Sequence, residues 1–159
     1  MAVTAIGSMN NRFIGLSTDT KPTGLEPGAT FFEYDTKNMM ITPDDGTSWT
    51  PKIGHAQYSN TTGADAIAMT LTPGIAWQLE GIRVHLDDAG GAGNLTAKID
   101  NGEGAAYDIV LLTQDMTAVT DLMWSPEDPI EFRAGDSLVI EWANAGEKTY
   151  GLEIVYKGI

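Results

Sequence analysis

The chain has 159 residues with 9 basic and 22 acidic side chains, which give a formal net charge of −13. It contains no cysteine, which excludes disulfides, thiolate metal sites and cysteine catalysis. So acidic a surface repels phosphate and argues against binding to nucleic acid or to an anionic membrane. Apolar residues make up 42% of the sequence, enough for one folded domain with a short appendage.

No segment has the pattern of a leader peptide or a membrane span. The first sixteen residues lack a basic region and a continuous apolar run. No window approaches the roughly 18 consecutive apolar residues of a spanning helix. We therefore expect a protein that stays soluble after synthesis.

Charge and composition divide the sequence into two parts. Residues 1–54 carry four basic and six acidic side chains, whereas residues 55–159 carry five and sixteen, so the net charges are −2 and −11. The first part is rich in Thr, Pro and Gly, and the second part holds nearly all the long apolar runs. This predicts an N-terminal arm and small β-hairpin module over 1–54, followed by a compact domain over 55–159.

The first part reads as a mobile arm and a hairpin. Residues 1–16 carry scattered apolar side chains without a period, which is typical of a terminus that is mobile unless it docks. The pattern then predicts a strand, a turn and a return strand at residues 30–34, 35–38 and 39–42. Phe32 and Tyr34 share one face of the first strand, and Trp49 follows a second turn and covers the hairpin. A lone hairpin is marginal in water, so we expect it to pack on the main domain, a second copy or another protein.

The second part shows short strands at regular spacing. Alternating apolar residues predict strands at 66–71, 75–86, 95–99, 138–142 and 149–156. In the second of these the phase changes at Gly81, which predicts a β-bulge that keeps Ile82 and Val84 facing the core. The expected core comprises Trp77, Leu79, Ile82, Val84, Leu86, Leu95, Ile99, Leu138, Ile140, Trp142, Leu152 and Ile154.

Residues 109–122 fit either a helix or strands. Their apolar residues recur at spacings of three and four, as in an amphipathic helix, but the many β-branched residues favour strands at 106–112 and 119–124. With these, about eight short strands predict an all-β fold, an antiparallel β-sandwich or jelly roll.

Catalytic and metal-binding patterns are weak. His55 and His85 are the only histidines, His85 is expected to face solvent, and no serine sits in a G-x-S-x-G turn. The acidic loops at 87–94 and 100–104 could hold Ca²⁺, but neither matches the EF-hand pattern. Trp49 and Trp124, near turns, are the only plausible platforms for a sugar. We therefore expect no enzyme, no catalytic or metal site and no cofactor.

Residues 13–50 resemble a segment that recurs in structural proteins of tailed-bacteriophage virions. The likeness is carried by the phrases LSTDTKP at 16–22, GATFFEYDT at 28–36 and DGTSW at 45–49. Residues 134–140 and 144–154 also resemble small β-sandwich domains of phage structural proteins.

The resemblance implies a virion structural protein. Its most specific implication is a head decoration (cement) protein that binds the major capsid protein on the outer head surface, self-associates as a trimer and is soluble in the host cytoplasm before assembly. The alternatives are a tail-associated receptor- or carbohydrate-binding module and, third, a tail depolymerase.

The nearly neutral first part is the expected contact surface, because a strongly acidic domain would be repelled by an acidic shell. Phe13, Ile14 and Leu16 would supply apolar anchors and Arg12 a hydrogen-bonding one. The expected interface residues are Arg12, Phe13, Ile14, Leu16, Phe32, Tyr34 and Trp49. Deletion of residues 1–16 is then expected to abolish binding but not stability, unless the arm instead packs along its own sandwich as an extra strand.

Overall fold

The computed structural model describes residues 11–159 and the backbone of residues 4–5. The chain divides into two compact units: an N-terminal unit formed by Met1–Gly54 with Lys157–Ile159, and a second unit formed by His55–Tyr156. The sequence pattern did not predict that the last three residues belong to the N-terminal unit. Within the described residues, no helix is long and apolar enough to cross a membrane.

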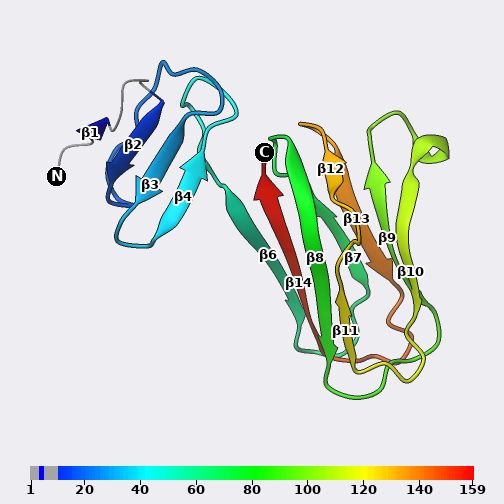
Figure 1. The fold of residues 1–159 in the computed structure, drawn as a ribbon. Helices are drawn as coiled ribbons and strands as arrows, with labels where there is room; N and C mark the ends of the chain where they lie inside the picture. Colours follow the sequence, from blue (N-terminus) through cyan, green and yellow to red (C-terminus); the bar gives the residue numbers. More distant parts are fainter. Residues whose placement is uncertain (1–3, 6–10) are drawn as a thin grey trace. The chain divides into compact units, whose positions relative to one another are not determined.

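The N-terminal unit is built on one sheet with the strand order β1-β2-β3-β4-β5 (Figure 1). Its strands are β1 (Thr4–Ala5), β2 (Arg12–Gly15), β3 (Thr30–Glu33), β4 (Asn38–Ile41) and β5 (Thr50–Pro51). β2 runs parallel to β3, and the other neighbours are antiparallel. We expected the β3–β4 hairpin to pack on the main domain, a second copy or another protein. That expectation is wrong for the hairpin's own support, because β2 and β5 of the same unit flank it and extend the sheet.

One face of this sheet is covered by the unit's own loops. Phe31 is fully buried and Phe13 is 9% exposed; the two are register partners across β2 and β3. Leu25, Met40 and Trp49 pack against them. The Trp49 ring meets Phe31 edge-on, with centroids 5.9 Å apart, and its Nε1 donates to the Gly46 carbonyl at 3.0 Å. We call this the inner face.

The second unit is a β-sandwich, which confirms the predicted all-β fold. Its nine strands, within residues 53–158, are β6 (Ile53–Asn60), β7 (Ile67–Leu71), β8 (Trp77–Leu86), β9 (Asn94–Asp100), β10 (Ile109–Asp115), β11 (Asp121–Trp124), β12 (Ile130–Phe132), β13 (Ser137–Trp142) and β14 (Tyr150–Gly158). One sheet has the order β10-β9-β13-β7; the other has β11-β8-β14-β6, with β12 also pairing with β8 (Figure 1). The ambiguous segment forms the strands β10 and β11, as favoured over a helix, but a short 3₁₀ turn, η1 (Ala105–Tyr107), stands where the first of these strands was expected to begin.

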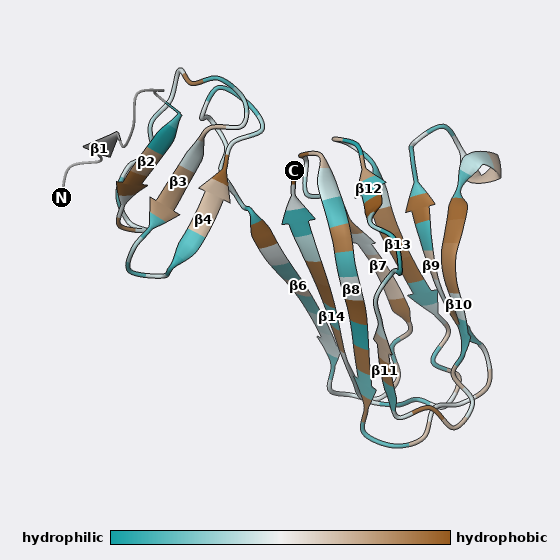
Figure 2. Cartoon of the chain, in the orientation of Figure 1, coloured by the Kyte–Doolittle hydropathy of each residue, from teal (hydrophilic) through white to brown (hydrophobic). Residues whose placement is uncertain are grey.

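The core of the sandwich lies between its two sheets. Buried apolar side chains alternate with outward polar ones along the strands, as the colouring of β8 illustrates (Figure 2). Every predicted core residue is buried except Ile99, which is half-buried. Trp77 stacks on Phe132, with centroids 3.9 Å apart, and meets Tyr156 edge-on at 5.7 Å.

The predicted change of phase in β8 is present. Trp77 and Leu79 are buried before Gly81, and Ile82 and Val84 are buried after it. β8 pairs with β12 as far as Leu79 and with β11 from Ile82 onward. At Gly81 an added Cβ would lie 3.1 Å from the Trp124 carbonyl oxygen, so the close approach of β11 also favours glycine there.

Candidate functional site

The structure separates the predicted interface residues between the two faces of the N-terminal sheet. Phe13 and Trp49 belong to the inner face and pack in the unit's own core. Phe13 is 9% exposed, so most of its side chain is already packed within this chain, although it also lines the hollow described below. The arm was predicted to be mobile unless it docks; its residues 12–15 form β2 inside the N-terminal sheet, and not an extra strand of the sandwich. The rest of that predicted arm lies largely outside the described residues.

The opposite, outer face of the sheet carries an open apolar row. Ile14, Phe32 and Met39 are register partners across β2, β3 and β4, so their side chains point to the same side. Met39 is 42% exposed, and Ile14 and Phe32 are half-buried. We call these three residues the outer row.

A hollow of about 350 Å³ lies beside the outer row. It is lined by Arg12, Phe13, Thr30, Phe32, Met39 and Lys52. Within the described part of the chain, neither the Arg12 guanidinium nor the Lys52 ammonium has an acidic partner. The outer face thus combines apolar surface with two cations whose charge is available to a partner.

Leu16 and Tyr34 do not line this hollow. The Leu16 amide donates to the Asp19 carboxylate at 2.9 Å. The Tyr34 amide donates to the Gly15 carbonyl at 3.1 Å, and its own carbonyl accepts from Lys37 Nζ at 2.6 Å. Both residues follow the ends of strands and shape the adjoining loops. Of the predicted interface residues, Arg12, Phe13 and Phe32 line the hollow, and Ile14 lies beside it in the outer row.

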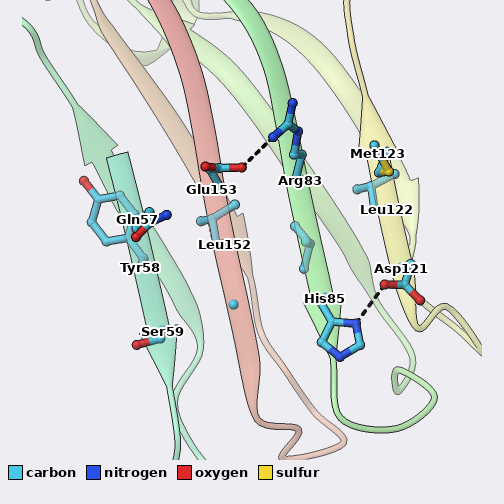
Figure 3. Close-up of a pocket in the computed structure, with 12 residues that line it drawn as sticks. Gln57, Tyr58, Ser59, Arg83, His85, Asp121, Leu122, Met123, Leu152 and Glu153 are labelled. Atoms are coloured by element: carbon cyan, nitrogen blue, oxygen red, sulfur yellow. Dashed lines mark hydrogen bonds and ion pairs between the residues drawn. The ribbon is translucent and has the colours of Figure 1, made fainter. Parts of the chain in front are cut away.

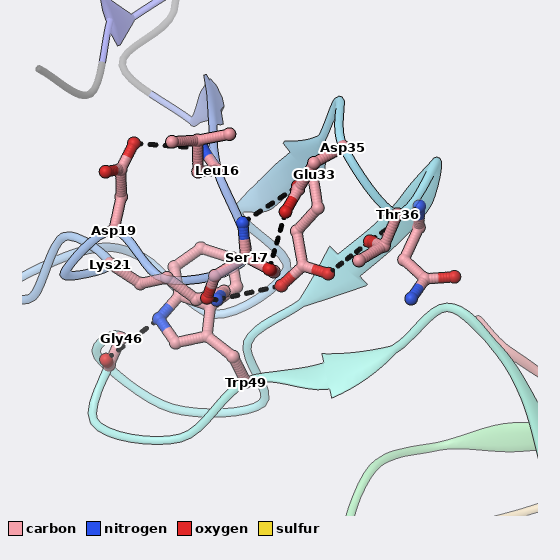
Figure 4. Close-up of polar contacts among 10 residues, drawn as sticks. Leu16, Ser17, Asp19, Lys21, Glu33, Asp35, Thr36, Gly46 and Trp49 are labelled. Atoms are coloured by element: carbon pink, nitrogen blue, oxygen red, sulfur yellow. Dashed lines mark hydrogen bonds and ion pairs between the residues drawn. The ribbon is translucent and has the colours of Figure 1, made fainter. Parts of the chain in front are cut away.

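A buried ion pair holds the loop after β2 against β3 (Figure 4). Glu33 is 5% exposed; its carboxylate meets Lys21 Nζ at 2.8 Å and accepts from Thr36 Oγ1 at 2.8 Å. Burial raises the pKa of Glu33, but the hydrogen bonds from Lys21 and Thr36 outweigh it and leave the pKa below its ordinary value. Lys21 Nζ also lies 5.0 Å from the Phe31 ring centroid. The carboxylate and the ammonium are therefore both engaged within the unit.

The acidic loops considered for Ca²⁺ use their carboxylates within the chain. Asp88 accepts from the Ala89 amide at 2.7 Å and from Lys148 Nζ at 3.1 Å. Asp100 accepts from the Gly102 amide at 2.9 Å. Across residues 11–159, no three histidine or acidic side chains gather as metal ligands would. These contacts are ordinary turn chemistry.

A groove of about 640 Å³ runs over the outward side of the β11-β8-β14-β6 sheet (Figure 3). It is lined by Gln57, Tyr58, Ser59, Arg83, Val84, His85, Asp121, Leu122, Met123, Gly151, Leu152 and Glu153. We call it the sandwich groove. Alternation in β8 predicted His85 to face solvent, and its side chain is 71% exposed. The groove itself was missed, because its residues come from four strands that the sequence does not place side by side.

Several polar side chains of the groove contact one another. His85 Nδ1 lies 2.7 Å from Asp121 Oδ1, and Arg83 Nη1 donates to Glu153 Oε2 at 2.8 Å. The other oxygen of Glu153 lies 2.9 Å from His55 Nδ1. Hydrogen bonds from His55 and Arg83 hold the pKa of Glu153 below its ordinary value, and the bond from His85 does the same for Asp121.

These groups do not form a catalytic triad. His85 and Asp121 resemble the base and its orienting acid, and Ser59 lines the same groove. However, β14 lies between β6, which carries Ser59, and β8, which carries His85. Two strand spacings amount to about 9–10 Å, beyond hydrogen-bond reach. His85 therefore does not activate Ser59 as a nucleophile in this arrangement.

No family model matches the sequence, and no curated protein matches it significantly. Among solved structures, the chain is similar to the family 32 carbohydrate-binding module from C. perfringens NanJ, whose structure was determined in complex with galactose. The identity is 11%, the TM-score is 0.42, and the match covers 67% of this chain and 94% of that one.

Proposed function

We propose that this chain is a virion structural protein of a tailed bacteriophage, a head decoration protein that attaches through its N-terminal unit to the major capsid protein. The observation that carries the proposal is the outer face of the N-terminal sheet, where the outer row lies beside Arg12 and Lys52. The resemblance of residues 13–50 to phage structural proteins supports the same reading. The proposed role is binding, without catalysis.

Charge favours this face for attachment. The N-terminal part carries a net −2 and the remainder −11, so the first part approaches an acidic shell with less repulsion. Burial of Phe32 and Met39 would supply the hydrophobic contribution, and Arg12 can make several hydrogen bonds from one planar group. A partner that fits presents an apolar patch bordered by carboxylates.

The copy number in purified virions tests the proposal. Gel densitometry against the major capsid protein is expected to give hundreds of copies per particle, as a head protein requires. A count of a few to tens would favour the tail-associated receptor- or carbohydrate-binding module instead. Absence from the particle would overturn a virion role altogether.

Rebinding to undecorated particles tests the attachment face. We expect Arg12→Glu and Phe32→Ser each to weaken binding at least tenfold, because they remove a cation and an apolar anchor from the same hollow. Arg133→Glu is the matched control, since it makes the same charge change at an exposed loop residue of the sandwich. Equal loss in the control would show that overall charge, and not this face, governs attachment.

The proposed assembly on the head is a trimer, with N-terminal units meeting around a threefold axis. A net charge of −13 opposes self-association in free solution, so the trimer is expected only on the particle. A particle reconstruction showing isolated single copies would refute this part of the proposal.

A further inference from the structure

We propose that the sandwich groove is a binding site for a neutral saccharide. The inference concerns a different unit from the proposed attachment face and does not depend on it. It rests on the shape of the groove, on the pairing of its charges and on the apolar side chains that border it.

β14 presents a glycine, Gly151, to solvent within the groove. Gly151 is exposed within a long strand, where glycine is disfavoured. Its φ is not positive, so the backbone does not require glycine. A Cβ built on it would meet no atom within 4 Å, so close packing does not require glycine either. What glycine does here is leave open the space that a side chain would fill.

The polar groups of the groove carry no excess of positive charge, which favours a ligand without negative charge. Arg83 pairs with Glu153, and His85 Nδ1 contacts Asp121, so these side chains present nitrogen and oxygen atoms in fixed directions. Sugar hydroxyls both donate and accept hydrogen bonds, and therefore fit such a mixture. A phosphate or sulfate would need an excess of cations that the groove lacks.

Apolar surface borders these polar groups. Met123 is 79% exposed and Tyr58 is 36% exposed. The C–H face of a sugar ring packs against surfaces of this kind while its hydroxyls bond to the neighbouring polar atoms. The volume of about 640 Å³ lies within the range of about 300–1,000 Å³ usual for small-molecule sites.

The position of the groove argues against a peptide ligand that adds a strand. Such a peptide needs the free edge of a sheet. β8 and β14, which run under the groove, both lie inside their sheet and have neighbours on each side. Recognition therefore depends on side chains, as in a saccharide site.

Screening of the full-length protein against an array of neutral, sialylated and sulfated glycans tests the ligand class. Saturation-transfer NMR with methyl glycosides of the common neutral hexoses and N-acetylhexosamines then measures binding in solution. We expect binding to neutral glycans. Binding confined to charged glycans, or to none, would overturn the proposal.

Gly151→Val tests the site. Valine suits a strand and its Cβ meets nothing, so the fold is expected to persist while affinity falls at least tenfold. Thr70→Val, exposed on β7 of the other sheet, is the control and should bind as the wild type does. Asp121→Asn, which alters the groove with almost no change in size, should also weaken binding. Undiminished saccharide binding by Gly151→Val would refute the site. The attachment of Gly151→Val to phage particles should be unchanged, because the attachment face lies in the other unit.

Discussion

Two adjacent phenylalanines of β3 should respond oppositely to truncation. Phe31 lies on the inner face, fully buried against Trp49, whereas Phe32 lies on the outer face and is half-buried. Replacement of a buried phenylalanine by alanine costs about 3–5 kcal/mol. The core of a unit below about 70 residues rarely supplies more than about 3–5 kcal/mol. Phe31→Ala is therefore expected to unfold the N-terminal unit, whereas Phe32→Ala should cost only about 1 kcal/mol.

Hydrogen exchange followed by mass spectrometry distinguishes the two outcomes. In Phe31→Ala, peptides covering β2, β3 and β4 should lose protection, while those covering β8 and β13 keep it. In Phe32→Ala, all these peptides should remain protected, yet binding to undecorated particles should fall. Retained protection of β3 in Phe31→Ala would refute the assignment of the inner face, and full particle binding by Phe32→Ala would refute the role of the outer face.

Four further substitutions test the packing and the buried charge. Ile140→Ala should destabilise the sandwich by about 2–5 kcal/mol in chemical denaturation, because Ile140 is fully buried, whereas its half-buried neighbour Val139→Ala should cost clearly less. Gly81→Ala should lower the melting temperature, since its Cβ would press on the β11 backbone; an unchanged value would contradict the close approach there. The lowered pKa of Glu33 means that its stabilising contribution is present above its ordinary value of 4.5 and is lost as pH falls through the folded-state pKa. In Lys21→Met the Glu33 carboxylate stays buried but loses the ammonium, so its pKa should rise. NMR titration of the Glu33 carboxyl should show this rise, and the difference in stability between the variant and the wild type should become smaller in acid. An unchanged titration would show that the ion pair contributes little.

The core of the sandwich could be predicted because its signal is local. A period of two in each strand identifies which residues face inward, and the change of phase at Gly81 is visible in the sequence itself. The same reasoning could not decide which face of the N-terminal sheet is covered. The covered face depends on where the loop carrying Trp49 folds back, and the sequence does not show this. Phe13 and Trp49 were therefore predicted to be interface residues, although Phe13 belongs to the unit's own core and Trp49 packs against that core.

The candidate site on the sandwich lay beyond the sequence for a related reason. Gly151, Arg83, Asp121 and Tyr58 belong to four strands, and only the sheet order brings them together. Each residue alone looks ordinary: an exposed charge, a strand glycine, a surface tyrosine. The outward direction of His85 was the one local signal, and it indicated exposure without indicating its neighbours.

The division of the chain also constrains the order in which its parts are completed during synthesis. The amide of Gly158 donates to the Lys52 carbonyl at 2.6 Å, a contact within the N-terminal unit that spans the whole intervening sandwich sequence. Translation delivers residues 55–156 before Gly158 leaves the ribosome, so the sandwich can fold while the N-terminal unit still lacks its last segment. In the folded sandwich β6 and β14 are neighbouring strands, so Lys52 and Gly158 are connected through ordered structure and not through a long flexible loop. Folding of the sandwich therefore lowers the entropy cost of that final contact.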